Sequence, residues 1–203
     1  MQNRLFKTLI SVLALFMVAT AASAQEKGFQ SNFDFSFDML GRPSSEDYDF
    51  EGSWMNAERI IYTAGYRVNH SHFIGLGFGF SLYNLNIYGY GSFPSFPILL
   101  DYRAYFKEKN NFSLLLDTTF GPAINFRGDW DNKSRDYYVD EETSVASRVS
   151  LSMALKFGFN YRLVNKLSLV GMFGLQVRGG DDTGGLKKGE WSLGPSVQIG
   201  ISF

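Results

Sequence analysis

The chain has 203 residues, a formal net charge of −1 and no cysteine. The lack of cysteine excludes structural disulfides, thiolate metal sites and a lipid anchor on cysteine. A charge balance this close to zero is not that of a nucleic-acid-binding protein, so we predict no nucleic-acid partner.

The first 24 residues have the three-part layout of a secretory signal peptide. Arg4 and Lys7 form a basic start, and an apolar run that is too short to cross a bilayer as a helix leads to small residues ending at Ala24. We predict cleavage between Ala24 and Gln25, which changes the formal charge from −1 to −3 because two cations are removed. The chain then divides into a signal peptide, 1–24, and one exported domain, 25–203.

The exported domain is dominated by alternation of apolar and polar residues, which is typical of strands with one apolar face. In the first segment Phe33, Phe35 and Phe37 alternate with polar residues such as Asp34, and Ser31 is the exception in the apolar set. The pattern recurs in eight segments: 29–39, 60–68, 74–82, 96–106, 112–120, 149–161, 167–177 and 191–203. Each spans 9 to 13 residues, and a tilted membrane strand needs about 9 to 11.

The connections between these segments alternate between short and long. Short turns are expected near 69–72, 107–111 and 164–166, and long loops over 40–57, 84–95, 122–148 and 179–190. Membrane barrels have tight turns on the periplasmic side and longer loops outside. We therefore predict an all-β fold, an up-and-down antiparallel transmembrane β-barrel of about eight strands, preceded by a cleavable signal peptide. The uncharged stretch 73–100 is long enough for a membrane helix, but its glycines and prolines favour two strands and a loop.

A soluble ligand-carrying barrel would also alternate, so the two strand faces must be compared. The apolar set carries no charge, and a lipid-facing Arg or Lys at mid-membrane costs roughly 2 to 4 kcal/mol. The opposite face is rich in Gly and Ser, which suits the crowded lumen of a small barrel. Aromatic residues near the strand ends predict two interfacial girdles. They are Tyr66, Phe73, Phe106, Phe112 and Tyr161 toward the periplasm, and Phe80, Phe96, Phe120 and Trp191 toward the outside.

With these features the domain 25–203 resembles the outer-membrane β-barrel families that include the OmpA transmembrane domain and small, porin-like eight-stranded barrels. Its most specific element is the chain end, where Val197, Ile199, Ile201 and Phe203 resemble the signal that those families present to the barrel-assembly machinery. The resemblance implies an integral outer-membrane location and contact with outer-membrane lipids and lipopolysaccharide. The families include channels, adhesins and lipid-modifying enzymes, so the fold does not fix the activity. Pro195 departs from an ideal last strand and predicts a bulge near the outer rim.

Five charged residues fall on the polar face near the middle of their strands: Asp34, Asp101, Arg103, Asp117 and Lys156. Because buried charges must be paired, we predict a polar network that plugs the lumen. The alternative is a narrow or gated path for ions or small solutes. The bulky interior residues Leu99, Leu115, Tyr83 and Tyr105 favour the plug.

The two histidines, His70 and His72, flank Ser71 and suggest a Ser-His hydrolase like the lipid A-modifying enzymes of outer membranes. Those enzymes act at the outer leaflet, whereas this turn is expected on the periplasmic side, and residues so close in sequence rarely form a positioned nucleophile and base. We therefore predict a solvated turn and no catalytic residue.

The long loops are acidic and aromatic. The segment 129–136 lacks the glycine and terminal glutamate of an EF-hand loop, so we predict no metal site and no cofactor. The aromatic residues form either a recognition surface or a layer that packs the loops onto the barrel rim; they are Tyr48, Phe50, Trp54, Trp130, Tyr137 and Tyr138. The sequence predicts a non-enzymatic barrel with a structural or adhesive role, and a narrow channel is the alternative.

Overall fold

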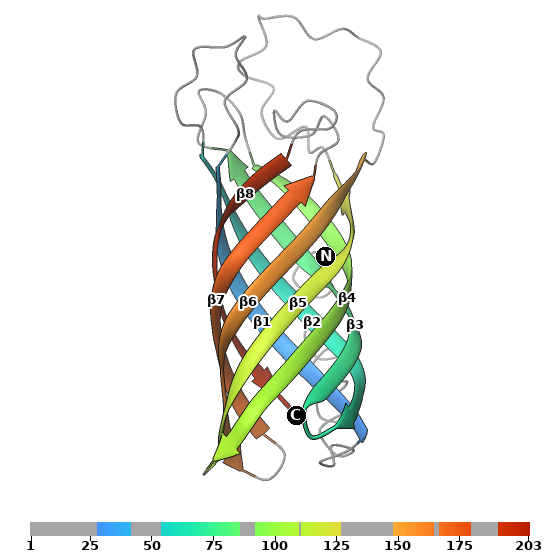
Figure 1. Ribbon diagram of the computed structural model, residues 1–203. Helices are drawn as coiled ribbons and strands as arrows, with labels where there is room; N and C mark the ends of the chain where they lie inside the picture. The colour runs from blue at the N-terminus through green and yellow to red at the C-terminus, as the bar shows by residue number, and fades with distance from the viewer. Residues whose placement is uncertain are drawn as a thin grey trace, which may run out of the picture.

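The fold is a closed barrel of eight antiparallel strands (Figure 1). The computed structural model describes residues 28–41, 54–85, 92–109, 111–126, 148–164, 167–179 and 191–203. The strands are β1 (Gly28–Gly41), β2 (Trp54–Asn69), β3 (His72–Leu85), β4 (Ser92–Lys109), β5 (Phe112–Asn125), β6 (Arg148–Val164), β7 (Leu167–Gly179) and β8 (Trp191–Ser202). Each strand pairs with the next, and β8 pairs with β1, which confirms the predicted up-and-down topology. No helix within the described residues is long and apolar enough to cross a membrane.

Several strands extend beyond the predicted segments. β2 begins at Trp54, which pairs with Gly41, so the prediction that Trp54 lies within the first long loop is wrong. The physical reason is that the alternation continues toward the chain start, since Met55, Ala57 and Arg59 are all buried. The strands thus reach further toward the end of the barrel that carries the long connections.

The short turns lie together at the opposite end of the barrel, where the chain also ends (Figure 1). Between β2 and β3 the side-chain Oδ1 of Asn69 accepts hydrogen bonds from the backbone N–H groups of Ser71 at 2.8 Å and His72 at 2.9 Å. Between β4 and β5, Asn111 has a φ of 67°, in the left-handed region that asparagine tolerates better than most residues. The alternation of short and long connections is as predicted.

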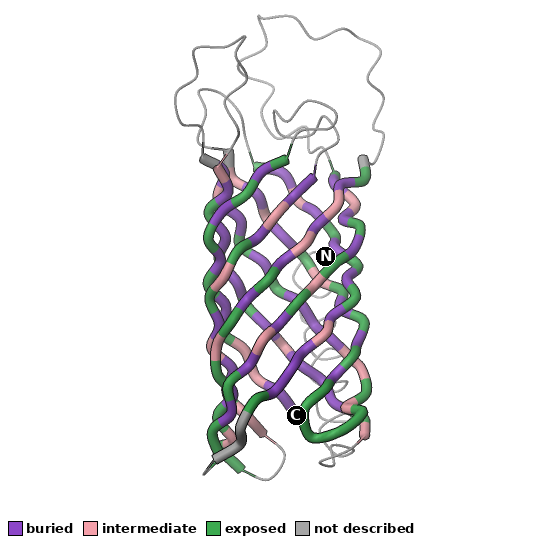
Figure 2. The backbone as a smooth tube through the Cα atoms, viewed as in Figure 1, coloured by how far each residue is buried: buried purple, intermediate pink, exposed green. Residues whose placement is uncertain are grey.

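Buried and exposed residues alternate along the strands (Figure 2), and the two sets differ sharply in polarity. Large apolar side chains point outward and stay exposed, as in Phe173 (65%), Leu76 (62%) and Ile199 (61%). Inward residues are buried and largely polar or small. A continuous apolar exterior is the reverse of a soluble barrel and fits a lipid environment. Glu58 on β2 is an exposed exception, beside Phe37 on β1.

Two expectations about individual side chains are corrected. Phe73 was predicted for the periplasmic girdle but is fully buried in the lumen, because its neighbour Ile74 faces outward and adjacent residues of a strand point to opposite faces. Pro195 produces no bulge: β7 and β8 stay in register through it. Instead, the pairing of β1 with β8 is interrupted at Met39 and Leu40 and resumes in the same register. The missing N–H of Pro195 thus interrupts the hydrogen-bonded ladder without inserting an extra residue.

The outward Ser31, an exception in the sequence pattern, has a partner. Its hydroxyl lies 2.9 Å from the hydroxyl of Tyr62 on the neighbouring strand. Both residues are buried, at 0% and 6% exposure, so the contact avoids leaving a buried hydroxyl without a partner.

Candidate functional site

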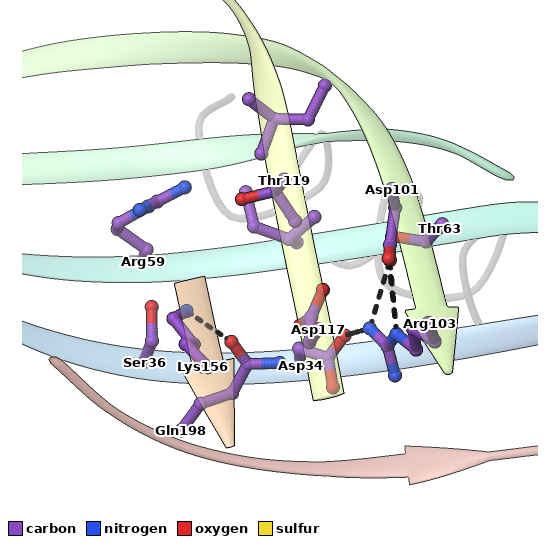
Figure 3. Close-up of a pocket in the computed structure, with 12 residues that line it drawn as sticks. Asp34, Ser36, Arg59, Thr63, Asp101, Arg103, Asp117, Thr119, Lys156 and Gln198 are labelled. Carbon is purple, nitrogen blue, oxygen red and sulfur yellow. Dashed lines mark hydrogen bonds and ion pairs between the residues drawn. The ribbon is translucent and has the colours of Figure 1, made fainter. Parts of the chain in front are cut away.

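The five charged residues predicted for the lumen line one cavity inside the barrel (Figure 3). They come from β1, β4, β5 and β6, and none is more than 3% exposed. The strand alternation places each of them inward, and the closure of the sheet brings them together. They are Asp34, Asp101, Arg103, Asp117 and Lys156.

Arg103 is the centre of the ion pairing. Its Nη2 donates to Oδ2 of Asp34 and, at 3.0 Å, to Oδ2 of Asp101. Its Nε lies 3.3 and 3.2 Å from the two carboxylate oxygens of Asp101. The planar guanidinium group suits this arrangement because its donors form a rigid fork that serves two carboxylates at once.

Asp117 and Lys156 do not pair directly with each other. In the sheet register Asp117 lies beside Arg103 on one side and Lys156 on the other. However, Lys156 donates to the side-chain oxygen of Gln198, and neither carboxylate oxygen of Asp117 has a hydrogen-bond partner among the described residues. The structure therefore gathers the five predicted residues but joins only three of them in direct ion pairs.

A second ion pair was missed by the sequence reading. Arg59 Nη1 lies 3.2 Å from Asp38 Oδ2 and also donates to the side-chain oxygen of Gln176, while Asp38 accepts from Ser196. Asp38 alternates with the apolar set of the segment 29–39, whereas Arg59 falls between the predicted loop 40–57 and the predicted segment 60–68. Extending the alternation by one residue would have found it.

Arg178 was missed for the same reason at the other end of a strand, because it immediately follows the predicted segment of β7. Its guanidinium carbon lies 4.0 Å from the ring centre of Tyr83 and 4.8 Å from that of Phe93. Its Nη2 donates to the side-chain oxygen of Asn125 at 2.7 Å. With Arg178 and the second ion pair included, the charged residues buried in the described lumen balance: Asp34, Asp38, Asp101 and Asp117 against Arg59, Arg103, Lys156 and Arg178.

Apolar clusters flank the charged layer on both sides. Toward the short turns, the buried cluster consists of Phe73, Tyr105, Leu115, Val170 and Met172. Toward the long connections, it consists of Leu40, Met55, Ala57, Tyr83 and Phe93. Polar groups also contact these clusters, since Arg178 stacks on Tyr83 and Phe93 and Gln30 donates to the hydroxyl of Tyr105. The charged layer thus has a buried apolar cluster on each side.

The cavity between the charged residues is small. Its volume is about 10 Å³. Roughly 10 to 15 Å³ of such volume is needed to hold one water, so the cavity has room for about one molecule of that size. The lumen at this level is filled by side chains.

The turn with Ser71 does not assemble a nucleophile and a base. His72 Nδ1 lies 2.8 Å from the hydroxyl of Tyr102, and the two rings are stacked. Both histidines are exposed, as predicted for a solvated turn. No hydrogen bond joins the Ser71 hydroxyl to either imidazole within the described residues. Across all the residues that the structure describes, no group of three or more His, Asp or Glu residues is arranged to hold a metal ion.

The remaining predicted residues belong to the last strand and to the predicted long loops. Val197 and Ile199 face outward with 58% and 61% exposure, and Ile201 is half-buried on the same face. The backbone of Phe203 pairs with Ser31 through hydrogen bonds of 2.7 and 2.9 Å, so the chain end helps to close the barrel. Their reading by assembly machinery stays a prediction. The loop aromatics Tyr48, Phe50, Trp130, Tyr137 and Tyr138 lie outside the described residues, and Trp54 is the first residue of β2.

Comparison with known proteins finds likeness in structure and none in sequence families. No protein-family model matches the chain, and no curated protein matches its sequence. The neisserial surface protein NspA has a TM-score of 0.56 at 16% identity, with 86% of this chain and 96% of that chain covered. The N-terminal barrel domain of Pseudomonas aeruginosa OprF has a TM-score of 0.41 at 10% identity, covering 87% and 99%. The Yersinia pestis attachment protein Ail, solved with a heparin analogue, has a TM-score of 0.45 at 12% identity, covering 87% and 99%.

The chain therefore has the fold of the small eight-stranded outer-membrane β-barrels. The resemblance inferred from the sequence is confirmed at the level of the fold. At these identities the likeness to solved structures identifies the architecture and not the activity.

Proposed function

We propose that this protein is a non-enzymatic integral outer-membrane barrel that acts through the surface presented by its long outer connections, in a structural or surface-recognition role. The observation that carries the proposal is the layered lumen. A charged layer held by ion pairs lies between two buried apolar clusters.

Ion conduction needs a continuous hydrated path, and apolar constrictions close such paths by excluding water. Leu115 and Val170 toward the short turns, and Leu40 toward the long connections, are fully buried at 0% exposure. An ion in the charged layer would have to cross one of these clusters to leave. This arrangement supports a plug over the alternative of a narrow or gated channel.

The proposed location rests on the apolar exterior and the predicted export signal. The outward apolar residues suit outer-membrane lipids, and the end with the long connections suits the cell exterior, where lipopolysaccharide lies. Export would proceed with cleavage near Ala24, and the last strand, through Val197 to Phe203, would be read by the barrel-assembly machinery. The aromatic residues of the long connections would supply the contact surface.

Single-channel recording in planar lipid bilayers tests the closed lumen. The mature protein is refolded in detergent, and folding is verified by the shift of the unboiled band on a denaturing gel. We expect no discrete current steps above the lipid background, whereas an open porin in the same detergent gives them. Reproducible steps from the folded protein would favour the channel alternative.

Binding measurements on loop variants test the surface role. One variant carries Trp130→Ser, Tyr137→Ser and Tyr138→Ser in a long connection, and the control carries His70→Ser and His72→Ser in a turn at the opposite end. We expect labelled lipopolysaccharide or whole bacterial cells to bind the wild-type protein and the control variant in nanodiscs. Binding should be lost only with the loop variant. Equal binding by both variants would contradict recognition through these aromatics.

A further inference from the structure

Five buried polar atoms of residues that line the central cavity have no hydrogen-bond partner among the described residues. They are both carboxylate oxygens of Asp117, Oδ1 of Asp34, Nη1 of Arg103 and Nε of Arg59. All four residues are at most 3% exposed. A buried polar or charged atom without a hydrogen-bond partner is costly. The number of such atoms around one cavity indicates that a further group bridges them.

The cavity has room beside these atoms. Thr119, two residues along β5 from Asp117, lines the cavity and is only half-buried although its strand neighbours on the lumen side are buried. In Figure 3 Asp117 lies between the Lys156–Gln198 contact and the group formed by Arg103 with its carboxylates. The available volume of about 10 Å³ corresponds to one water-sized molecule.

The chemistry of the lining selects the occupant. The unpartnered set contains carboxylate acceptors and guanidinium donors from Arg103 and Arg59, so the occupant must both donate and accept hydrogen bonds. A metal cation cannot accept from Arg103 and would be repelled by the neighbouring charges of Arg103 and Lys156. Water meets both requirements, and buried waters typically make about three hydrogen bonds to such groups.

We propose that the central cavity is a binding site for one ordered water molecule, which donates to Asp117 and Asp34 and accepts from Arg103 Nη1. The water links Asp117 to the ion-paired group and completes the network across the lumen. The site does not depend on what the outer surface binds.

Nuclear Overhauser contacts between water and methyl groups test the site in the full-length mature protein, folded in nanodiscs. The apolar residues Ile61 and Leu99 line the cavity. Leu115 and Val170 belong to the apolar cluster nearer the short turns and serve as internal controls. Methyl protons do not exchange with solvent, so these signals report proximity to a water with a long residence time.

We expect cross-peaks from water to Leu99 and Ile61 methyls and none to Leu115 and Val170. Absence of water cross-peaks to Leu99 and Ile61 in the wild-type protein would overturn the proposal. Cross-peaks at all four residues would also overturn it, because they indicate a continuous water path; that result would contradict the closed lumen as well. Failure of the site alone is therefore distinguishable from failure of the proposed function.

Two substitutions of Thr119 sharpen the test. Thr119→Val keeps the size of the side chain and removes the hydroxyl, so the cross-peaks should persist. Thr119→Leu adds volume toward the cavity, and the cross-peaks to Leu99 should be lost. Persistence in the folded Thr119→Leu variant would place the water elsewhere and contradict the assigned site.

Discussion

Arg103 on β4 and Asp34 on β1 form an ion pair across the lumen although their strands are not neighbours in the sheet. The same guanidinium group holds Asp101, so one cation compensates two buried carboxylates. This contact ties opposite parts of the barrel wall together through its interior.

Removal of the Arg103 charge should be strongly destabilising. Arg103→Met leaves Asp34 and Asp101 buried without their cation, which typically costs about 3 to 5 kcal/mol. The free energy of unfolding in urea, measured in lipid vesicles, reports the loss. Adding Asp34→Asn and Asp101→Asn to the same variant should recover a large part of it, because the two carboxylates that Arg103 compensated are then neutral amides. A single variant as stable as the wild type would contradict the role of this pair.

The contact of Arg178 with Tyr83 should contribute a measurable coupling energy. The guanidinium group lies 4.0 Å from the ring centre, and both residues are buried at 1% exposure. A double-mutant cycle with Arg178→Met and Tyr83→Leu should give a coupling of roughly 0.5 to 2 kcal/mol in unfolding free energy. Additive effects of the two substitutions would show that the stacked geometry adds no stability of its own.

Charge on the outer face should be penalised according to depth. Leu155 lies near the middle of β6 at 53% exposure, whereas Val149 lies near the strand end toward the long connections at 55%. Because the two are almost equally exposed, depth is the main difference. Leu155→Arg should lower the unfolding free energy in lipid by roughly 2 to 4 kcal/mol and Val149→Arg by about 0 to 1 kcal/mol. Equal costs for the two variants would argue against a bilayer around the barrel.

The pairing of β1 with β8, which closes the barrel, should be weakened by a single added methyl group. A Cβ at Gly194 on β8 would lie 1.6 Å from the backbone oxygen of Met39 on β1, which cannot move without separating the strands. At Gly171 the added atom would meet the ring of Phe159 at 2.7 Å, and an outward ring can rotate away. Gly194→Ala should therefore cost roughly 1 to 3 kcal/mol. Gly171→Ala should cost less, and the two unfolding curves compare them directly. A larger cost at Gly171 would contradict this account of the closure.

The alternation of apolar and polar residues predicts most of the architecture. Strand alternation is a property of adjacent residues, so the eight strands, their order and the outward set could be predicted from the sequence. The same parity would have placed Phe73 in the lumen, and the error came from grouping it with aromatic residues near the membrane interfaces. The ends of strands were less certain, because alternation fades where loops begin, and Arg59 and Arg178 were missed there.

The sequence by itself determined that the chain is a membrane barrel with Asp34, Asp101, Arg103, Asp117 and Lys156 inside it. Only the tertiary structure decided that Arg103 takes both Asp34 and Asp101. It also decided that Lys156 turns to Gln198. The reason is that parity fixes which face a side chain occupies, whereas contacts across the lumen depend on strand tilt and stagger around the closed barrel. Those quantities arise from the pairing of all eight strands together, so they have no signature in any single segment.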